Sequence, residues 1–227
     1  DVLFNEKILE KGAKIVKDVN KTVADIIGIN AAARTTCVKP SGNASVLLQT
    51  ASGIHAEHSP KYIRNIQMNK ESEITQAIVK SNPYMVEESV WSANGTDVVI
   101  SFPIVPHKGS MYKEELYGVK HLELVAKAQK HWVLAGTNEE LCADEGVRHN
   151  VSNTIIVDDW DEVEKYVFEN RYSFSGISFL SMSGDKDFNQ APNTAVIDDK
   201  QMVKKYGPAA IFASGLVVDA MKVYPNL

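Results

Sequence analysis

The sequence predicts an α/β fold in which strands alternate with helices along one chain. Short runs rich in β-branched residues, at residues 35–38, 97–102 and 151–157, are typical of core strands. Longer segments whose apolar residues recur at helical spacing, such as residues 114–134, lie between them. Because neighbouring parallel strands need a helical crossover, this alternation predicts a largely parallel sheet.

The first of these elements is a long amphipathic helix. Its apolar residues recur from Ile8 to Ile27, and Gly28 follows as a natural C-terminal residue. The apolar run at residues 35–38 then leads into a loop, and residues 44–51 suit a short helix. This part of the chain therefore reads as helix, strand, loop and helix.

The next part of the chain has a similar alternation. Residues 62–68 are expected to be extended, and residues 73–80 to form a helix that breaks before Pro83. The strand at residues 97–102 is expected to stop at Pro103, which lacks the amide hydrogen that a sheet uses.

The C-terminal half continues the pattern. Asp158 and Asp159 offer caps for one of its helices. The predicted helices lie at residues 114–134, 160–168 and 207–224, and the predicted strands at 151–157 and 176–180. We find no repeat, low-complexity tract or linker, so residues 1–227 are expected to form a single α/β domain.

Composition limits the classes of function. A chain of 227 residues that is 44% hydrophobic can bury a core, and its net charge of -5 gives no overall reason to bind nucleic acid or an anionic membrane. No apolar run approaches the roughly 20 residues that a membrane span needs. The two cysteines, Cys37 and Cys142, form no CxxC pattern, and Cys37 is expected to be a buried small hydrophobe. A cytoplasmic protein without disulfides or membrane contact is expected.

The loop after the first predicted strand has the composition of an anion site. It contains Lys39, Pro40, Ser41, Gly42, Asn43, Ala44 and Ser45. Gly42 lets a backbone approach a ligand closely, and the free amides of a helix start favour phosphate. The loop matches neither GxxxxGK[ST] nor GxGxxG. From the residues alone, phosphate binding and a plain capped turn both remain open.

A second cluster contains two histidines. His55 and His58 are three residues apart, as two metal ligands on a helix can be. Gly53 and Pro60 argue against a continuous helix, and no third ligand follows at a suitable spacing. A loop held by hydrogen bonds is therefore expected instead of a metal site. No catalytic set of nucleophile, base and orienting group can be assembled from the spacing.

The exact strings carry a more specific signal. TTCVKPSGNASVLLQTASGIHAEHSPKYIRN, residues 35–65, resembles the TTCVKPSGTxSxLxxxASGIHxxxSPYYIR segment of adenosylcobalamin-dependent, class II ribonucleotide reductases. Similar strings follow in the order of that family, namely DVVISFPI at 97–104, HLELVAKAQKHWV at 121–133, HNVSNTIIVDDWDEVEKYVFEN at 149–170 and YSFSGISFLSMSGDKDFNQAP at 172–192. The resemblance runs from roughly residue 20 to residue 195.

This resemblance implies a fold, a reaction and a set of partners. The fold is the C-terminal portion of a ten-stranded α/β barrel, and the reaction converts ribonucleotides to 2′-deoxyribonucleotides by a thiyl-radical mechanism with adenosylcobalamin as cofactor. The family's NPCxE-like radical loop has no match in this sequence, so catalytic residues are assigned to none of its positions. The implied partners are the remaining N-terminal part of the reductase, a thioredoxin-like reductant and a ribonucleotide, with the triphosphate favoured over the diphosphate.

The resemblance also assigns roles to residues. It implies that the loop Pro40–Ser45 holds the substrate phosphates, with Asn43 where the family has threonine. His55 is expected near the substrate, either in contact with it or shaping the loop beneath. Asn150, Ser152 and Thr154 alternate along a predicted strand and so share one face. They are expected either to contact nucleotide or cobalamin or to form an internal hydrogen-bonded layer.

Two other classes of function remain open. A non-catalytic nucleotide-binding or regulatory module derived from that barrel would keep the loop without the radical chemistry. A structural or interaction protein would need neither. In both enzymatic and non-catalytic cases, this chain alone is expected to show no turnover.

Overall fold

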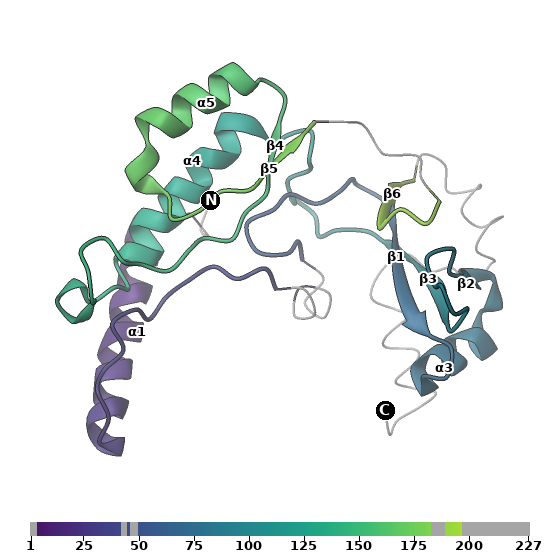
Figure 1. Ribbon diagram of the computed structural model, residues 1–227, viewed down its shortest axis with the longest axis horizontal. Helices are drawn as coiled ribbons and strands as arrows, with labels where there is room; N and C mark the ends of the chain where they lie inside the picture. The colour runs from purple at the N-terminus through teal and green to yellow at the C-terminus, as the bar shows by residue number, and fades with distance from the viewer. Residues whose placement is uncertain (1–3, 42–44, 46–49, 183–188, 197–227) are drawn as a thin grey trace. The chain divides into compact units, whose positions relative to one another are not determined.

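The computed structural model describes residues 4–41, 45, 50–182 and 189–196. They form two compact units (Figure 1). The first unit holds the described residues up to His55 together with Glu114–Met182, and the second holds Ala56–Lys113 together with residues 189–196. Each unit has its own core, and the single domain expected over residues 1–227 stays a prediction.

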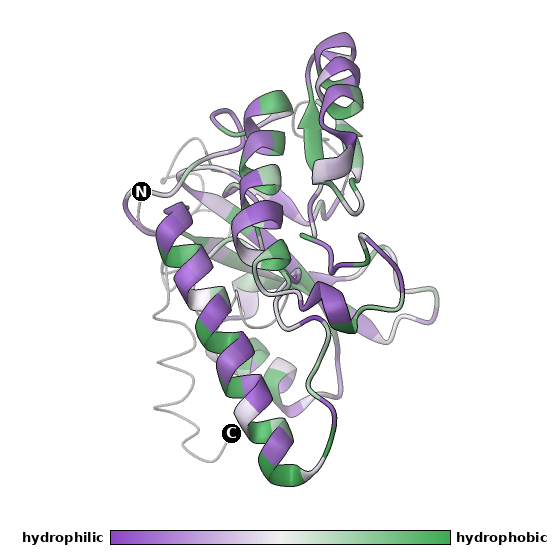
Figure 2. Ribbon diagram, turned by 90° about the vertical axis from the view of Figure 1, so that its left-hand side faces the viewer, coloured by the Kyte–Doolittle hydropathy of each residue, from purple (hydrophilic) through white to green (hydrophobic). Residues whose placement is uncertain are grey.

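Helix α1, Glu6–Ile27, begins the first unit, as its apolar periodicity predicts. The Asn5 side chain caps its start by accepting a hydrogen bond from the Ile8 amide. Gly28 ends the helix in the left-handed conformation, with φ at 74°, which a residue without a side chain adopts at little cost. Figure 2 shows apolar and polar residues interleaved along the whole of α1.

Helix α4, Gly118–Ala128, continues directly into the stretch η2, Gln129–Leu134, whose backbone is π-helical. The helix predicted over residues 114–134 therefore starts four residues later than expected, ends at Leu134 as expected, and is π-helical over its last six residues. The wider π-helical turn changes which positions face inward, so that Ala128 and Val133 are both buried although they are five residues apart. Sequence periodicity assumes a constant pitch and misses this change.

Helix α5, Trp160–Glu169, follows as predicted. The Asp159 carboxylate caps its start by accepting hydrogen bonds from the amides of Asp161 and Glu162. Two short 3₁₀ turns of the first unit, η3 and η4, lie at Glu139–Leu141 and Arg171–Ser173.

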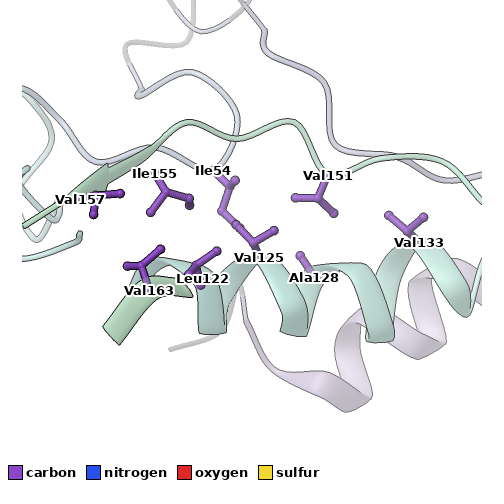
Figure 3. Close-up of a cluster of buried hydrophobic side chains, with 9 residues drawn as sticks. All are labelled: Ile54, Leu122, Val125, Ala128, Val133, Val151, Ile155, Val157 and Val163. Atoms are coloured by element: carbon purple, nitrogen blue, oxygen red, sulfur yellow. The ribbon is translucent and has the colours of Figure 1, made fainter. Parts of the chain in front are cut away.

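The core of the first unit lies between α4, η2 and α5 on one side and the extended segment that includes residues 151–157 on the other (Figure 3). Its nine buried side chains are Ile54, Leu122, Val125, Ala128, Val133, Val151, Ile155, Val157 and Val163. Because most are aliphatic and none is more than 7% exposed, this cluster is the main hydrophobic contribution to the unit.

The first unit has one parallel strand pair. Strand β4, Ile155–Val157, pairs with β5, Phe179–Ser181. Both are shorter than the strands predicted at residues 151–157 and 176–180. Val151 instead forms a single parallel bridge with Val38.

The strand predicted at residues 35–38 is absent from this part of the structure. Side chains occupy its backbone acceptors: Trp132 Nε1 donates to the Cys37 carbonyl at 3.1 Å, and His149 Nδ1 bonds the Thr36 carbonyl at 3.1 Å. The amides of Thr35 and Val38 donate to the backbone carbonyls of Gly136 and Asn150, so the segment's polar groups find separate partners without a continuous neighbouring strand. The prediction of a strand at residues 35–38 is therefore wrong, and within this segment Val38 forms an isolated β-bridge.

The second unit contains a four-stranded sheet in the order β2-β3-β1-β6. Its strands are β1 at Tyr62–Asn69, β2 at Val86–Glu88, β3 at Asp97–Ile104 and β6 at Asn193–Ala195. Helix α3, Glu73–Ser81, and the 3₁₀ turn η1, Pro83–Met85, connect β1 to β2. Ile78 of α3 packs on Val98 and Ile100 of β3.

All three strand pairs of this sheet are antiparallel, so the prediction of a largely parallel sheet is wrong. Although α3 separates β1 from β3 in the sequence, β3 lies antiparallel to β1, with Ile66 opposite Ile100. Strand β3 also continues through Pro103. Its neighbour β2 pairs only with residues 98–100, so among the described strands Pro103 faces a partner on one side only.

Some predictions fall on residues outside this description. They are the closing helix at residues 207–224 and all of the short helix at residues 44–51 except Ser45, Thr50 and Ala51. Among the described helices, none combines the length and apolar character that a membrane span requires.

Candidate functional site

Half of the predicted phosphate loop lies within the described residues. Pro40 is exposed, Ser41 is partly buried and Ser45 is 1% exposed, whereas Gly42, Asn43 and Ala44 lie outside the description. The Ser45 amide donates to the Ser41 carbonyl oxygen at 2.8 Å. The Ser45 amide hydrogen is therefore bonded within the protein and is not available to donate to a phosphate oxygen.

A tight turn lies directly against the start of this loop. Gly53 has φ at 59°, and a side-chain carbon placed on it would lie 3.2 Å from the Lys39 carbonyl oxygen and 3.7 Å from Pro40 Cα. Both the left-handed conformation and the close approach favour glycine. The turn at Gly53 thus lies in close contact with Lys39 and Pro40, the residues that begin the loop.

His55 follows this turn and faces a second histidine. Its Nδ1 bonds the Ser52 carbonyl at 2.5 Å, so Nδ1 carries the hydrogen and donates. The rings of His55 and His121 meet edge to face, with centroids 6.0 Å apart and planes at 81°. His121 comes from α4, and its Nε2 donates to the Ile54 carbonyl at 2.5 Å. His121 therefore binds the carbonyl of the peptide that joins Ile54 to His55, and its ring lies against the His55 ring.

Sequence reasoning missed His121. The ring is only 2% exposed, and burial lowers its pKa, an effect that the hydrogen bond to Ile54 opposes and the nearby His55 reinforces. Its Nδ1 is buried and has no hydrogen-bond partner among the described residues. The helical spacing that marks Leu122 and Val125 as core positions also includes position 121, so the signal was present in the sequence.

The three polar residues of the HNVSNTIIV string do share one face, as their alternation predicts. Val151, Asn153 and Ile155 are buried, whereas Asn150 is exposed and Ser152 and Thr154 are partly exposed. The last three side chains form no hydrogen bond with any other described residue. They therefore lie on the face turned away from the core, where a ligand can reach donors and acceptors that the protein has not used.

The internal hydrogen bonds of this segment come from Asn153, which sequence reasoning also missed. Its Nδ2 donates to the carbonyls of Val151 at 2.7 Å and Gly176 at 3.1 Å. Its Oδ1 accepts from the Ser178 amide at 3.4 Å. Asn153 thus forms internal hydrogen bonds, while the role of its neighbours Asn150, Ser152 and Thr154 stays a prediction.

The structure brings the polar face next to the strand-like segment that enters the loop. The Val38 amide donates to the Asn150 carbonyl at 3.4 Å, and the Ser152 amide donates to the Val38 carbonyl at 2.9 Å. Because this bridge is parallel, the chain runs in one direction from Val38 into the loop and from Val151 along the polar face. The candidate site thus consists of the loop, the turn at Gly53 and the face formed by Asn150, Ser152 and Thr154.

The site contains no recognisable catalytic group of its own. Both cysteines are free and partly buried, and neither lies in a radical-loop motif. Within the described residues, no three His, Cys, Asp or Glu side chains gather closely enough to hold a metal ion. Among its described residues, the site presents polar side chains that are at least partly exposed.

Comparison with known proteins gives the class. No protein-family model matches the chain. Its fold matches the crystal structure of a B12-dependent, class II ribonucleotide reductase with a TM-score of 0.71 at 20% identity, over 98% of this chain and 29% of that one. The fold is therefore that of part of a class II ribonucleotide reductase. The ten-stranded barrel stays a prediction, because the described residues contain two small sheets.

Curated relatives make the resemblance more specific. The chain is 28% identical over 172 residues to a probable adenosylcobalamin-dependent ribonucleoside-triphosphate reductase of Dictyostelium discoideum, covering 76% of this chain and 21% of that protein. It is 25% identical over 195 residues to the adenosylcobalamin-dependent ribonucleoside-triphosphate reductase of Euglena gracilis, covering 85% and 25%. The resemblance predicted from the sequence strings is confirmed, and the chain spans about a fifth to a quarter of each relative's length.

Proposed function

We propose that this chain is part of an adenosylcobalamin-dependent ribonucleoside-triphosphate reductase and supplies the loop that holds the substrate's phosphates. The observation that carries the proposal is the similarity to two such reductases over 76% and 85% of the chain. The matching fold, with a TM-score of 0.71, supports it. The names of both relatives favour a nucleoside triphosphate over a diphosphate as substrate.

The described geometry is consistent with a phosphate role for residues 40–45. The turn at Gly53 lies against the backbone of Lys39 and Pro40, and Ser41 is partly exposed, so its hydroxyl group can donate to a ligand. The Ser45 amide already donates to Ser41. The proposed donors to the phosphate oxygens are therefore the Ser41 hydroxyl group, the Asn43 side chain and the backbone amides that precede Ser45.

The polar face fits the remaining parts of the ligands. Asn150, Ser152 and Thr154 offer amide and hydroxyl groups with no partner among the described residues. Such groups suit a ribose or the amide-bearing edge of cobalamin, which in the bound state supplies the radical chemistry of the reaction. The proposed task of this chain's residues is to bind and orient these ligands.

The chemistry requires groups that this sequence does not contain. Neither Cys37 nor Cys142 lies in an NPCxE-like string, so the proposed partner is a polypeptide that carries the radical cysteine. A thioredoxin-like reductant is proposed for the complete enzyme. This division of roles explains why the chain alone is expected to show no turnover.

The decisive experiment mixes the purified chain with a polypeptide that carries the finger-loop cysteine, adenosylcobalamin, a dithiol reductant and a ribonucleoside triphosphate. Deoxyribonucleotide formation that requires both polypeptides supports the proposal. If both fold and associate but no ribonucleotide is reduced, the enzymatic role is wrong. Nucleotide binding without turnover would then favour the non-catalytic module.

A binding experiment tests the loop separately. Replacing Gly42 with valine adds a branched side chain where close backbone approach is proposed, and the affinity for nucleoside triphosphate should fall at least about tenfold, or 1.4 kcal/mol. Thermal unfolding of the variant serves as the control for its fold. Unchanged affinity in a folded variant would remove the phosphate role of this loop.

A further inference from the structure

The first residue of η2, Gln129, has a buried amide side chain that forms hydrogen bonds with His149, Val151 and Ser175. Gln129 is 2% exposed. Its Nε2 donates to the His149 carbonyl at 2.9 Å and to Ser175 Oγ at 3.2 Å, and its Oε1 accepts from the Val151 amide at 3.2 Å. Both amide hydrogens and the amide oxygen are therefore used.

This pattern imitates a neighbouring strand. An extended segment offers the carbonyl of one residue and the amide two residues later to the same side, and Gln129 bonds both groups, on His149 and Val151. Residues 152–154 form no regular strand, and the segment is held by this side chain, Asn153, the Val38 bridge and bonds that link His149 with Thr36 and Ser175. The two residues that Gln129 bonds flank Asn150, the first member of the polar face.

The same stretch of chain also holds the entry to the phosphate loop. Thr36 Oγ1 donates to the Trp132 carbonyl at 2.6 Å, and Trp132 Nε1 donates back to the Cys37 carbonyl at 3.1 Å. Gly136 makes this approach feasible, since a side-chain carbon there would lie 2.0 Å from Thr36 Oγ1. The stretch from Gln129 to Gly136 thus contacts both segments of the candidate site.

We infer that Gln129 is a positioning residue that keeps Asn150, Ser152 and Thr154 in register with Val38, which leads into the proposed phosphate loop. The inference rests on the proposed function, because it assigns Gln129 to the geometry of the same nucleotide site. Gln129 begins the π-helical stretch η2, and Gln129 and Val133 of this stretch are both buried. Gln129 acts through the backbone of residues 149–151 and does not contact the ligand.

Two variants and one control test this role in the full chain. Gln129→Met keeps the length of the side chain and removes every hydrogen bond, whereas Gln129→Glu keeps the acceptor for Val151 and loses both donors. Leu122→Met is the control, because it changes a buried residue of the adjoining helix while roughly conserving volume. Each protein is compared by amide hydrogen exchange, by the free energy of unfolding and by its affinity for ATP and the other ribonucleoside triphosphates.

We expect Gln129→Met to raise exchange at least about tenfold at Val151 and Ser152 and to weaken nucleotide binding several-fold. Gln129→Glu should leave Val151 better protected than the methionine variant does. Leu122→Met should change neither local exchange nor affinity beyond its effect on global stability. Exchange that rises uniformly through the first unit in Gln129→Met would reduce Gln129 to a core residue and overturn the inference.

The outcomes also separate this inference from the function on which it rests. A wild-type chain that binds no nucleotide contradicts the phosphate-binding proposal and the inference together. Wild-type binding that both Gln129 variants retain at full affinity contradicts the inference alone.

Discussion

Helices α1 and α4 are both amphipathic, yet they use their apolar faces in opposite ways. Helix α4 buries Leu122, Val125 and Ala128 in the core of the first unit. Helix α1 buries only Ala13 and Ala24. Six of the larger aliphatic side chains of α1 are 47–77% exposed, namely Ile8, Ile15, Val19, Val23, Ile26 and Ile27.

Helix α1 packs through small and polar residues instead. Gly12 lets the Trp132 ring approach, since a side-chain carbon at this glycine would lie 3.3 Å from it. Lys17 Nζ donates to the Thr137 carbonyl at 3.1 Å, and Asn20 Oδ1 accepts from the Ala32 amide at 2.9 Å. Periodicity thus predicts that a helix forms, while its packing partners decide which face is covered.

The largest test of this difference compares one aliphatic truncation in each helix. Leu122→Ala leaves a cavity in α4's core and should lower the free energy of unfolding by about 2–5 kcal/mol. Ile15→Ala on the exposed face of α1 should change it by no more than about 0.5 kcal/mol. Chemical denaturation followed by circular dichroism measures both. Equal losses would mean that the α1 face is covered in solution.

Buried and exposed titrating groups provide a second test. Burial lowers the pKa of His121, so below about pH 6.5 the unfolded chain binds a proton that the folded chain does not. The free energy of unfolding is therefore not reduced by His121 above pH 6.5. It falls as the pH drops from there toward the lowered pKa, by at most about 1.4 kcal/mol per pH unit. His121→Gln should flatten this slope between pH 5 and 6.5, whereas His107→Gln, at an exposed position, should leave it intact.

The N-terminal caps of α1 and α5 should differ in their contribution to stability, with smaller effects than the two tests above. Asp159→Ala removes two hydrogen bonds and a favourable charge at the start of α5 and should cost about 1 kcal/mol. Asn5→Ala removes a single, longer bond of 3.2 Å at the start of α1 and should cost less. Thermal unfolding of both variants measures the difference, and a reversed order would contradict the ranking.

The smallest effect is expected on the solvent face of α1. Lys14 pairs with Asp18 at 2.9 Å one turn later, with both side chains well exposed. Such pairs contribute only a few tenths of a kcal/mol and are screened by salt. Lys14→Ala should therefore change the midpoint of thermal unfolding only slightly, and the change should be smaller still in high salt. A shift as large as that of Asp159→Ala would show that this face is not simply solvated.

Much of the local structure could be predicted from the sequence. Residues close along the chain determine the extent of α1, its end at Gly28, the cap at Asp159 and the alternation through Asn150 and Val151. These features depend on helical or strand periodicity and on side chains that bond amides a few residues away. The family resemblance also came from the sequence, because its strings occur in the same order along the chain.

Tertiary structure alone decided which groups meet. It made the larger sheet antiparallel, replaced a predicted strand at residues 35–38 with bonds from Trp132 and His149, and buried His121 beneath the Ile54 peptide. The contacts between β1 and β3, and those of Trp132, His149 and His121, join residues 28 or more positions apart in the chain. A local pattern states what a segment prefers, but the partner that satisfies a backbone or covers an apolar face is chosen by packing across the whole unit.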